Sequence, residues 1–131
     1  MQKSFLIIAA VYGALSVVLG AFGAHMLKQT VGAGALEVYE TGVRYQFYHT
    51  IALLAVGILA AWFPGRALTA SGWLFTLGVI LFSGSLYLIT WMQASGKTVP
   101  AGVGVLTPLG GLLFIAGWIF LIVAVAAKRP A

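Results

Sequence analysis

Residues 67–96 read ALTASGWLFTLGVILFSGSLYLITWMQASG, a run of thirty residues without a charged side chain. The hydrocarbon core of a bilayer is about 30 Å thick, and roughly 20 helical residues at about 1.5 Å each cross it. This run is therefore long enough to cross a membrane as one helix. Three further uncharged runs flank it, at residues 4–27, 45–65 and 98–127. Together the four runs predict four membrane spans.

The composition of the chain excludes several classes of protein. Of the 131 residues, 62% are hydrophobic and 7% are charged, whereas a soluble domain carries about 25% charged residues. The chain has no cysteine, which excludes a thiolate nucleophile and a cysteine-rich metal site. It also has no aspartate, and its only acidic side chains are Glu37 and Glu40. We therefore expect a multi-spanning, non-enzymatic membrane protein.

Breaks between the uncharged runs indicate where the helices end. Pro64-Gly65 is typical of a helix end, and Thr107-Pro108 is typical of a helix start, with an N-cap followed by proline. We predict an all-α integral membrane four-helix bundle, formed by a single transmembrane domain over residues 1–131. Its predicted spans are residues 4–27, 45–63, 67–92 and 108–127, and an amphipathic helical segment at 36–44 extends the start of the second span.

Small residues recur at seven-residue spacing in each predicted span. In lipid, small side chains let helix backbones approach closely, and a seven-residue period keeps such a seam facing its neighbour in a left-handed bundle. We therefore predict left-handed packing along these seams. The positions are Gly13 and Gly20; Thr50 and Gly57; Ser71, Gly78 and Ser85; and Gly110, Gly117 and Ala124.

Basic residues near the span ends bear on orientation. Four spans place both termini on one side, and that side carries four basic residues against three opposite, which predicts cytoplasmic termini. The basic residues are scattered singly rather than clustered on one face, so we expect no nucleic-acid partner. They are Lys3, Arg66, Lys128 and Arg129 on the terminal side, and Lys28, Arg44 and Lys97 on the other.

Five side chains near the first helical hairpin form a candidate polar site: His25, Glu40, Arg44, Tyr45 and His49. An antiparallel hairpin can bring the two histidines to a similar depth, and two imidazoles are the minimum for a haem or metal site. The alternative is that each histidine makes a local hydrogen bond. Glu40 and Arg44 are four residues apart, which favours an ion pair at the membrane interface or the mouth of a pathway.

The third predicted span carries hydroxyl groups on one stripe, at Ser83, Ser85 and Tyr87. Serine and threonine in membrane helices commonly hydrogen-bond to backbone carbonyls or across helices. The stripe is therefore a packing feature in one interpretation and the lining of a polar pathway in the other.

Several motifs occur in order along nearly the whole chain, and together they resemble the YgdD/YwdK-like family of small bacterial inner-membrane proteins. This resemblance implies a four-span protein of the plasma membrane, and it implies no reaction, because the family is uncharacterised. The motifs are GAFGAH at residues 20–25, YETGVRYQFYH at 39–49, FSGSLYL at 82–88, TPLGG at 107–111 and Gly117-Trp118.

Three functional hypotheses remain open from the sequence. The leading one is a non-enzymatic accessory, assembly or structural subunit of a membrane complex, or a homo-oligomer, in contact with the lipid bilayer and other membrane-protein subunits. The second is a small oligomeric transporter or channel with a pathway mouth at Glu40, Arg44 and His49. The third is a redox module that binds haem, a metal or a quinone through His25 and His49. No predicted span has a charge at its centre, which weighs against ion-coupled transport.

Overall fold

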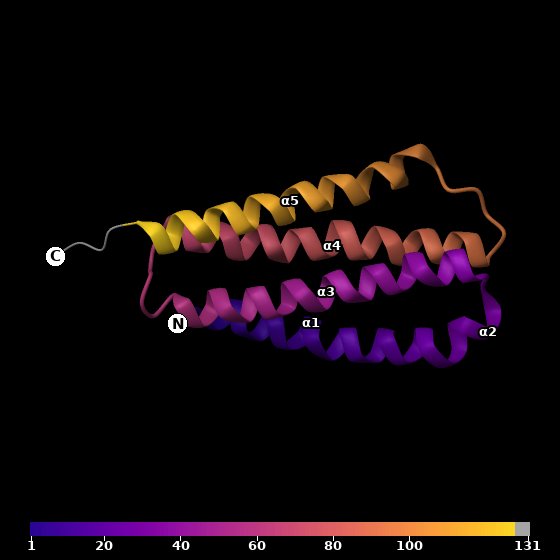
Figure 1. Ribbon diagram of the computed structural model, residues 1–131, viewed down its shortest axis with the longest axis horizontal. Helices are drawn as coiled ribbons and strands as arrows, with labels where there is room; N and C mark the ends of the chain where they lie inside the picture. The colour runs from indigo at the N-terminus through magenta and orange to yellow at the C-terminus, as the bar shows by residue number, and fades with distance from the viewer. Residues whose placement is uncertain (128–131) are drawn as a thin grey trace.

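The computed structural model of the chain describes residues 1–127, and within that range it contains helices and turns alone (Figure 1). The predicted all-α four-helix fold is confirmed. A π-helical turn and a short helix follow the first long helix. The elements are α1 (Lys3–Phe22), the π-helical turn (Gly23–Leu27), α2 (Lys28–Thr30), α3 (Ala33–Leu59), α4 (Arg66–Ala94) and α5 (Ala101–Ala126).

The four long helices pack in chain order, each against the next (Figure 1). The α4 helix lies between α3 and α5 and has its most extensive contacts with α5. The start of α1 and the end of α5 lie at the same end of the bundle, while α2 and the loop between α4 and α5 lie at the other. The chain therefore traverses the bundle four times.

Three helical stretches are long and apolar enough to cross a membrane: Lys3–Thr30, Arg66–Ala94 and Ala101–Ala126. Within the described residues α3 is not among these stretches, and it carries Glu37, Glu40, Arg44, Gln46 and His49. Nevertheless α3 runs antiparallel to α1 along its length. Near one end of the pair the Tyr39 hydroxyl bonds to α1, and near the other Gly57 lies against Leu6.

Residues of the predicted seams lie at the contacts between helices, some against one another and some against larger side chains. Gly13 of α1 lies beside Thr50 of α3, whose Cγ2 is 3.5 Å from the position that a Cβ on Gly13 would occupy. Between α4 and α5, the Ser71 hydroxyl donates to the Gly117 carbonyl oxygen at 2.8 Å, and Gly78 lies against the Phe114 ring. Close approach along the seams is therefore found, whereas the left-handed packing stays a prediction.

The predicted start of the last helix is wrong. The α5 helix begins at Ala101, so Thr107 and Pro108 lie inside it rather than at its N-terminus. Pro100 is the N-cap residue, with an extended backbone. The Thr107 hydroxyl, which the motif assigned to a cap, instead lies 2.6 Å from the Ser85 hydroxyl of α4.

The second helix is continuous with its amphipathic extension, as predicted, but its bounds differ from the prediction. The α3 helix starts at Ala33 and ends at Leu59, and a turn covers the residues before Pro64. The segment 36–44 and the first part of the predicted span 45–63 are therefore one continuous helix that packs against α1 and α4. Lys128 and Arg129, predicted to follow the last span, lie outside the described residues.

Candidate functional site

The amide of Gln46 is the centre of a buried polar network that joins three helices. Its Nε2 donates to the Tyr12 carbonyl oxygen at 2.9 Å, and its Oε1 accepts a hydrogen bond from the Tyr87 hydroxyl at 2.6 Å. The Tyr12 hydroxyl in turn donates to the Thr76 carbonyl oxygen at 2.8 Å. Gln46 is almost completely buried, so one side chain of α3 ties this helix to both α1 and α4.

Hydroxyl groups make further bonds between helices around this network. The Ser83 hydroxyl donates to the Gly42 carbonyl oxygen of α3 at 2.6 Å. The Tyr39 hydroxyl donates to the Leu19 carbonyl oxygen of α1 at 2.6 Å. Together with the bond between Ser85 and Thr107, these contacts place each hydroxyl of the predicted stripe against another helix of the bundle. Ser83, Ser85 and Tyr87 thus all make packing contacts.

The imidazole of His49 is held on both of its nitrogens. Its Nδ1 lies 2.8 Å from the Tyr45 carbonyl oxygen, and its Nε2 lies 3.1 Å from the indole Nε1 of Trp118. A carbonyl oxygen only accepts and an indole N–H only donates. His49 is therefore the neutral tautomer with the proton on Nδ1, and the Nε2 lone pair is occupied by Trp118 of α5.

Aromatic rings surround this histidine. The Phe114 ring stacks on the imidazole with a centroid distance of 3.6 Å and an interplanar angle of 5°. A cavity of about 410 Å³ opens beside the stack. Its walls are mostly aromatic, and the surface they offer is mainly apolar. The lining residues are Tyr45, His49, Phe82, Gly111, Phe114, Ile115 and Trp118.

The tautomer of His49 is open to a direct test. In ¹⁵N NMR spectra we expect His49 to carry its proton on Nδ1. The variant Trp118→Phe removes the only donor to Nε2 that the described residues provide, so the Nε2 resonance should shift while Nδ1 stays protonated. The loss of one hydrogen bond should also lower the free energy of unfolding by about 1 kcal/mol. The exposed His25 is the internal control, and a wild-type His49 protonated on Nε2 would contradict the assignment.

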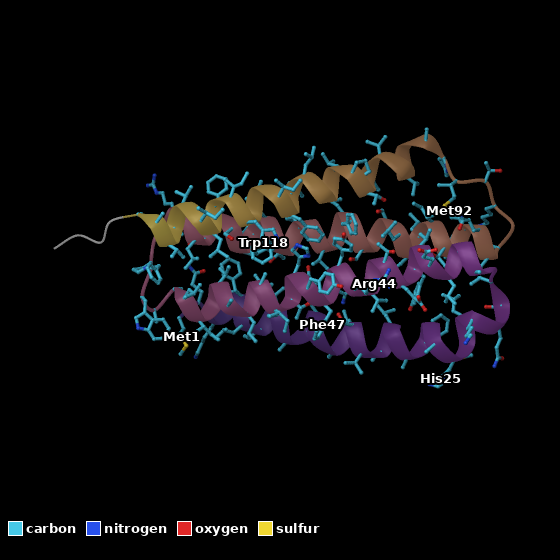
Figure 2. The ribbon with its side chains drawn as sticks, viewed as in Figure 1. Met1, His25, Arg44, Phe47, Met92 and Trp118 are labelled. Atoms are coloured by element: carbon cyan, nitrogen blue, oxygen red, sulfur yellow. The ribbon has the colours of Figure 1, made fainter. Side chains whose placement is uncertain are left out.

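His25 does not join this site. It is exposed on the π-helical turn, and it is labelled at the α2 end of the bundle, away from Trp118, in Figure 2. Thr50 packs against Gly13 of α1, so the neighbouring His49 is level with Gly13. His25 lies twelve residues after Gly13 in the chain. At about 1.5 Å per residue, the histidines differ in depth by about 18 Å. The expectation of a similar depth is therefore wrong.

The distance between the histidines bears on cofactor binding. One metal ion or haem iron cannot be ligated by both imidazoles of a single chain at such a separation. No group of three or more His, Cys, Asp or Glu side chains within residues 1–127 is placed to hold a metal ion. A quinone ring would meet the aromatic cavity beside His49, where the imidazole Nε2 already has its partner.

Glu40 and Arg44 lie on the outer face of α3, and both are exposed. Among the described residues they form no ion pair; one Arg44 guanidinium nitrogen instead donates to the Thr41 hydroxyl at 3.2 Å. Arg44 lines a groove of about 260 Å³ together with Ser16 and Val17. Those two residues are the midpoint of the stretch Lys3–Thr30, and Figure 2 shows Arg44 near the middle of the bundle.

The groove places Arg44 level with Ser16 and Val17, in the middle of the stretch Lys3–Thr30. The prediction started the second span at residue 45, whereas α3 begins at Ala33, and its Tyr39 already contacts α1 through Leu19. Arg44 and His49 also open into different cavities. The candidate residues therefore separate into three places: His25 alone, Glu40 with Arg44, and Tyr45 with His49.

Sequence reasoning missed the two side chains that organise the interior, Gln46 and Trp118. Gln46 lies between Tyr45 and Phe47 in the motif at residues 39–49. The predicted polar site includes Glu40, Arg44, Tyr45 and His49 of that motif but not Gln46. An amide set among the aromatic residues Tyr45, Phe47 and Tyr48 is the signal that the sequence offers, because a buried amide needs hydrogen-bond partners. Trp118 belongs to a predicted span, but its partner His49 is 69 residues away.

Comparison with known proteins places these features in a family context. Residues 19–111 match the family described as "Protein of unknown function (DUF423)". The UPF0382 membrane protein YwdK of Bacillus subtilis is 43% identical, over 94% of this chain and 96% of the relative. The UPF0382 inner membrane protein YgdD of Escherichia coli is 39% identical, over 98% and 94% respectively. A UPF0382 membrane protein of Haemophilus influenzae is 43% identical, over 92% of both chains. No solved structure matches.

Proposed function

This chain belongs to the UPF0382 (DUF423) family of multi-pass bacterial inner-membrane proteins, and from that premise we propose that it is a non-enzymatic subunit of a membrane assembly. In this role the bundle is a rigid helical unit whose outer surface contacts other membrane-embedded protein. The proposal also places both termini in the cytoplasm, because four basic residues lie on their side of the predicted spans.

The interior of the bundle supports a structural role. Throughout residues 1–127, every buried side-chain nitrogen and oxygen has a hydrogen-bond partner. A catalytic centre needs a nucleophile or base that is free to reach a substrate, and a proton or ion pathway needs groups that can exchange partners. Here Gln46, His49 and Ser83 are all engaged in contacts between helices. The interior polarity therefore serves helix association.

The observation that carries the proposal is the placement of Arg44. This side chain is exposed on the outer face of α3, level with the middle of the stretch Lys3–Thr30. A charged side chain at the centre of a membrane helix is unfavourable by about 2.5–3.5 kcal/mol on insertion scales, and such residues face protein or a water-filled cavity. Because the bundle leaves this face of α3 uncovered, a further protein surface is the environment that stabilises it.

The proposal is tested by measuring the mass of the assembly. Extraction of the intact chain from membranes directly into lipid nanodiscs, followed by native mass spectrometry, should give a particle whose protein mass exceeds the 13.7 kDa of one chain. A matched extraction into a harsh, dissociating detergent is the control and should return the single chain. A single chain in the nanodisc, with no protein bound, would contradict the proposal.

A further inference from the structure

We propose that the outer face of α3 binds a second copy of this chain within the membrane. We define the charged stripe as Glu37, Glu40, Arg44 and Tyr48. In the proposed dimer, Arg44 of each copy pairs with Glu40 of the other across a two-fold axis. This inference rests on the proposed function, and it adds the identity of the partner and the surface that the partner covers.

The charged stripe is a single face of one helix. Its members are three or four residues apart, and side chains at that spacing lie above one another on an α-helix. All four are exposed, whereas Gly42, Gln46 and His49 on the other side of α3 are buried among the remaining helices. One face of α3 thus packs against the other helices of the bundle, and no helix of the bundle covers the charged stripe on the opposite face.

Arg44 has little local compensation for its charge. Within residues 1–127, its one hydrogen bond is to the neutral Thr41 hydroxyl, at 3.2 Å. Its groove is otherwise lined by apolar and weakly polar side chains, among them Val17 and Phe47. Ionisable residues inside membranes generally pair with one another, so an acidic group from outside this chain is the missing partner.

A second copy supplies that acidic group, because the stripe carries both signs of charge within one turn. In a two-fold interface, a residue i that contacts residue j places j against i on the other side. When two copies of α3 lie parallel at equal depth, Glu40 of one copy and Arg44 of the other are offset by four residues, or about 6 Å, along the helix axis. An arginine side chain can bridge that offset, so two equivalent pairs form at once.

The exposed apolar faces of α1 and α5 offer no such argument. The outer face of α5 is apolar, with Leu112, Ile115 and Ile122 more than half exposed. Acyl chains solvate such a face as well as another protein does, since lipid tails are as apolar as leucine. The charged stripe is therefore the surface that lipid covers poorly and a second copy covers well.

Cross-linking in membranes tests the interface directly. Since the chain has no cysteine, the variant Tyr48→Cys carries a single thiol, one turn from Arg44 on the stripe. Oxidation with copper phenanthroline in native membranes should yield a covalent dimer of twice 13.7 kDa. The matched control is Leu112→Cys on α5, since Tyr48 is 54% exposed and Leu112 is 62% exposed. The control should give several-fold less dimer.

Charge exchange tests the pairing itself. In the Tyr48→Cys background, Arg44→Glu or Glu40→Arg sets like charges opposite one another and should weaken association about tenfold. The double variant Glu40→Arg with Arg44→Glu restores opposite charges across the axis and should recover the dimer. A double variant that stays as weak as the single variants, at equal expression, would overturn the pairing.

The outcomes separate this inference from the proposed function. Native mass spectrometry can give an assembly while Tyr48→Cys cross-links only to a different protein or to none. In that case the proposed dimer through the charged stripe is wrong, and the proposed function as a subunit stands. If the nanodisc holds one chain alone, both fail. If Leu112→Cys cross-links as strongly as Tyr48→Cys, the dimer does not use the charged stripe.

Discussion

Replacing Gly110 with alanine is expected to lower the free energy of unfolding by about 1–3 kcal/mol, the usual range for overpacking a close contact. A Cβ at this position would lie 2.8 Å from the Cα of Phe82 in α4. The obstacle is backbone rather than a flexible side chain, so α4 and α5 must move apart. The same movement would strain the nearby bond between Ser85 and Thr107.

The neighbouring glycine provides a matched control. A Cβ on Gly111 would meet the Phe82 ring at 3.9 Å, which is an ordinary van der Waals contact, so Gly111→Ala should leave stability nearly unchanged. Thermal unfolding of both variants in the same detergent or nanodisc gives the comparison. Equal stability of Gly110→Ala and Gly111→Ala would show that the two helices do not approach as closely as described.

Replacing Gln46 with leucine is the second change with a large expected effect. Leucine has a similar size but removes the acceptor for the Tyr87 hydroxyl, and a buried group left unpaired is unfavourable by about 1–3 kcal/mol. The Tyr12 carbonyl oxygen is less affected, because it also accepts the Ser16 hydroxyl at 2.8 Å. Most of the loss should therefore come from Tyr87, measured as a lower midpoint of chemical or thermal unfolding.

A double-variant cycle identifies the source of that loss. Tyr87→Phe removes the hydroxyl that Gln46→Leu leaves without an acceptor, so the two changes together should be less damaging than the sum of the single effects. Gln93→Leu is the control, because Gln93 is exposed on α4 and its replacement should have little effect. Additive effects of Gln46→Leu and Tyr87→Phe would contradict a direct bond between them.

Much of the fold could be predicted from the lengths of the uncharged runs and from the seven-residue spacing of the small residues. The apolar runs indicate four helices because charge is the strongest signal against a membrane span. The seams indicate the helix contacts because glycine and serine allow close approach. The pairs Gly13 with Thr50 and Ser71 with Gly117 both follow this rule. Neighbouring helices joined by short connections pair in order, so the topology also followed.

The errors arose where a local motif competed with tertiary packing. Thr107-Pro108 is typical of a helix start, yet α5 begins at Ala101 and the Thr107 hydroxyl bonds across to Ser85. For α3, the prediction started the second span at residue 45, directly after Arg44. The level of Arg44 along the bundle, beside Ser16 and Val17, follows from the packing of α3 against α1, and the residues of α3 alone do not predict such contacts between helices.

The candidate site was predicted only in part. A local hydrogen bond was one of the alternatives for each histidine, and the imidazole of His49 does make one, to the Tyr45 carbonyl oxygen. The link from His49 to Trp118 joins residues that are 69 positions apart in the chain. Sequence periodicity within one helix does not predict a contact between two helices. The tautomer of His49 and the aromatic cavity beside it are therefore evident only from the three-dimensional structure.

The hub position of Gln46 has a consequence for biogenesis. The hairpin of α1 and α3 is complete before α4 is synthesised, but the Oε1 of Gln46 receives its hydrogen bond from Tyr87 of α4. A nascent chain that has inserted only this hairpin thus exposes an amide oxygen to lipid, and nearby Gly42 still lacks the Ser83 hydroxyl. The arrival of α4 removes both defects together. The polar groups of the first hairpin are therefore fully hydrogen-bonded only after the second hairpin has entered the bilayer.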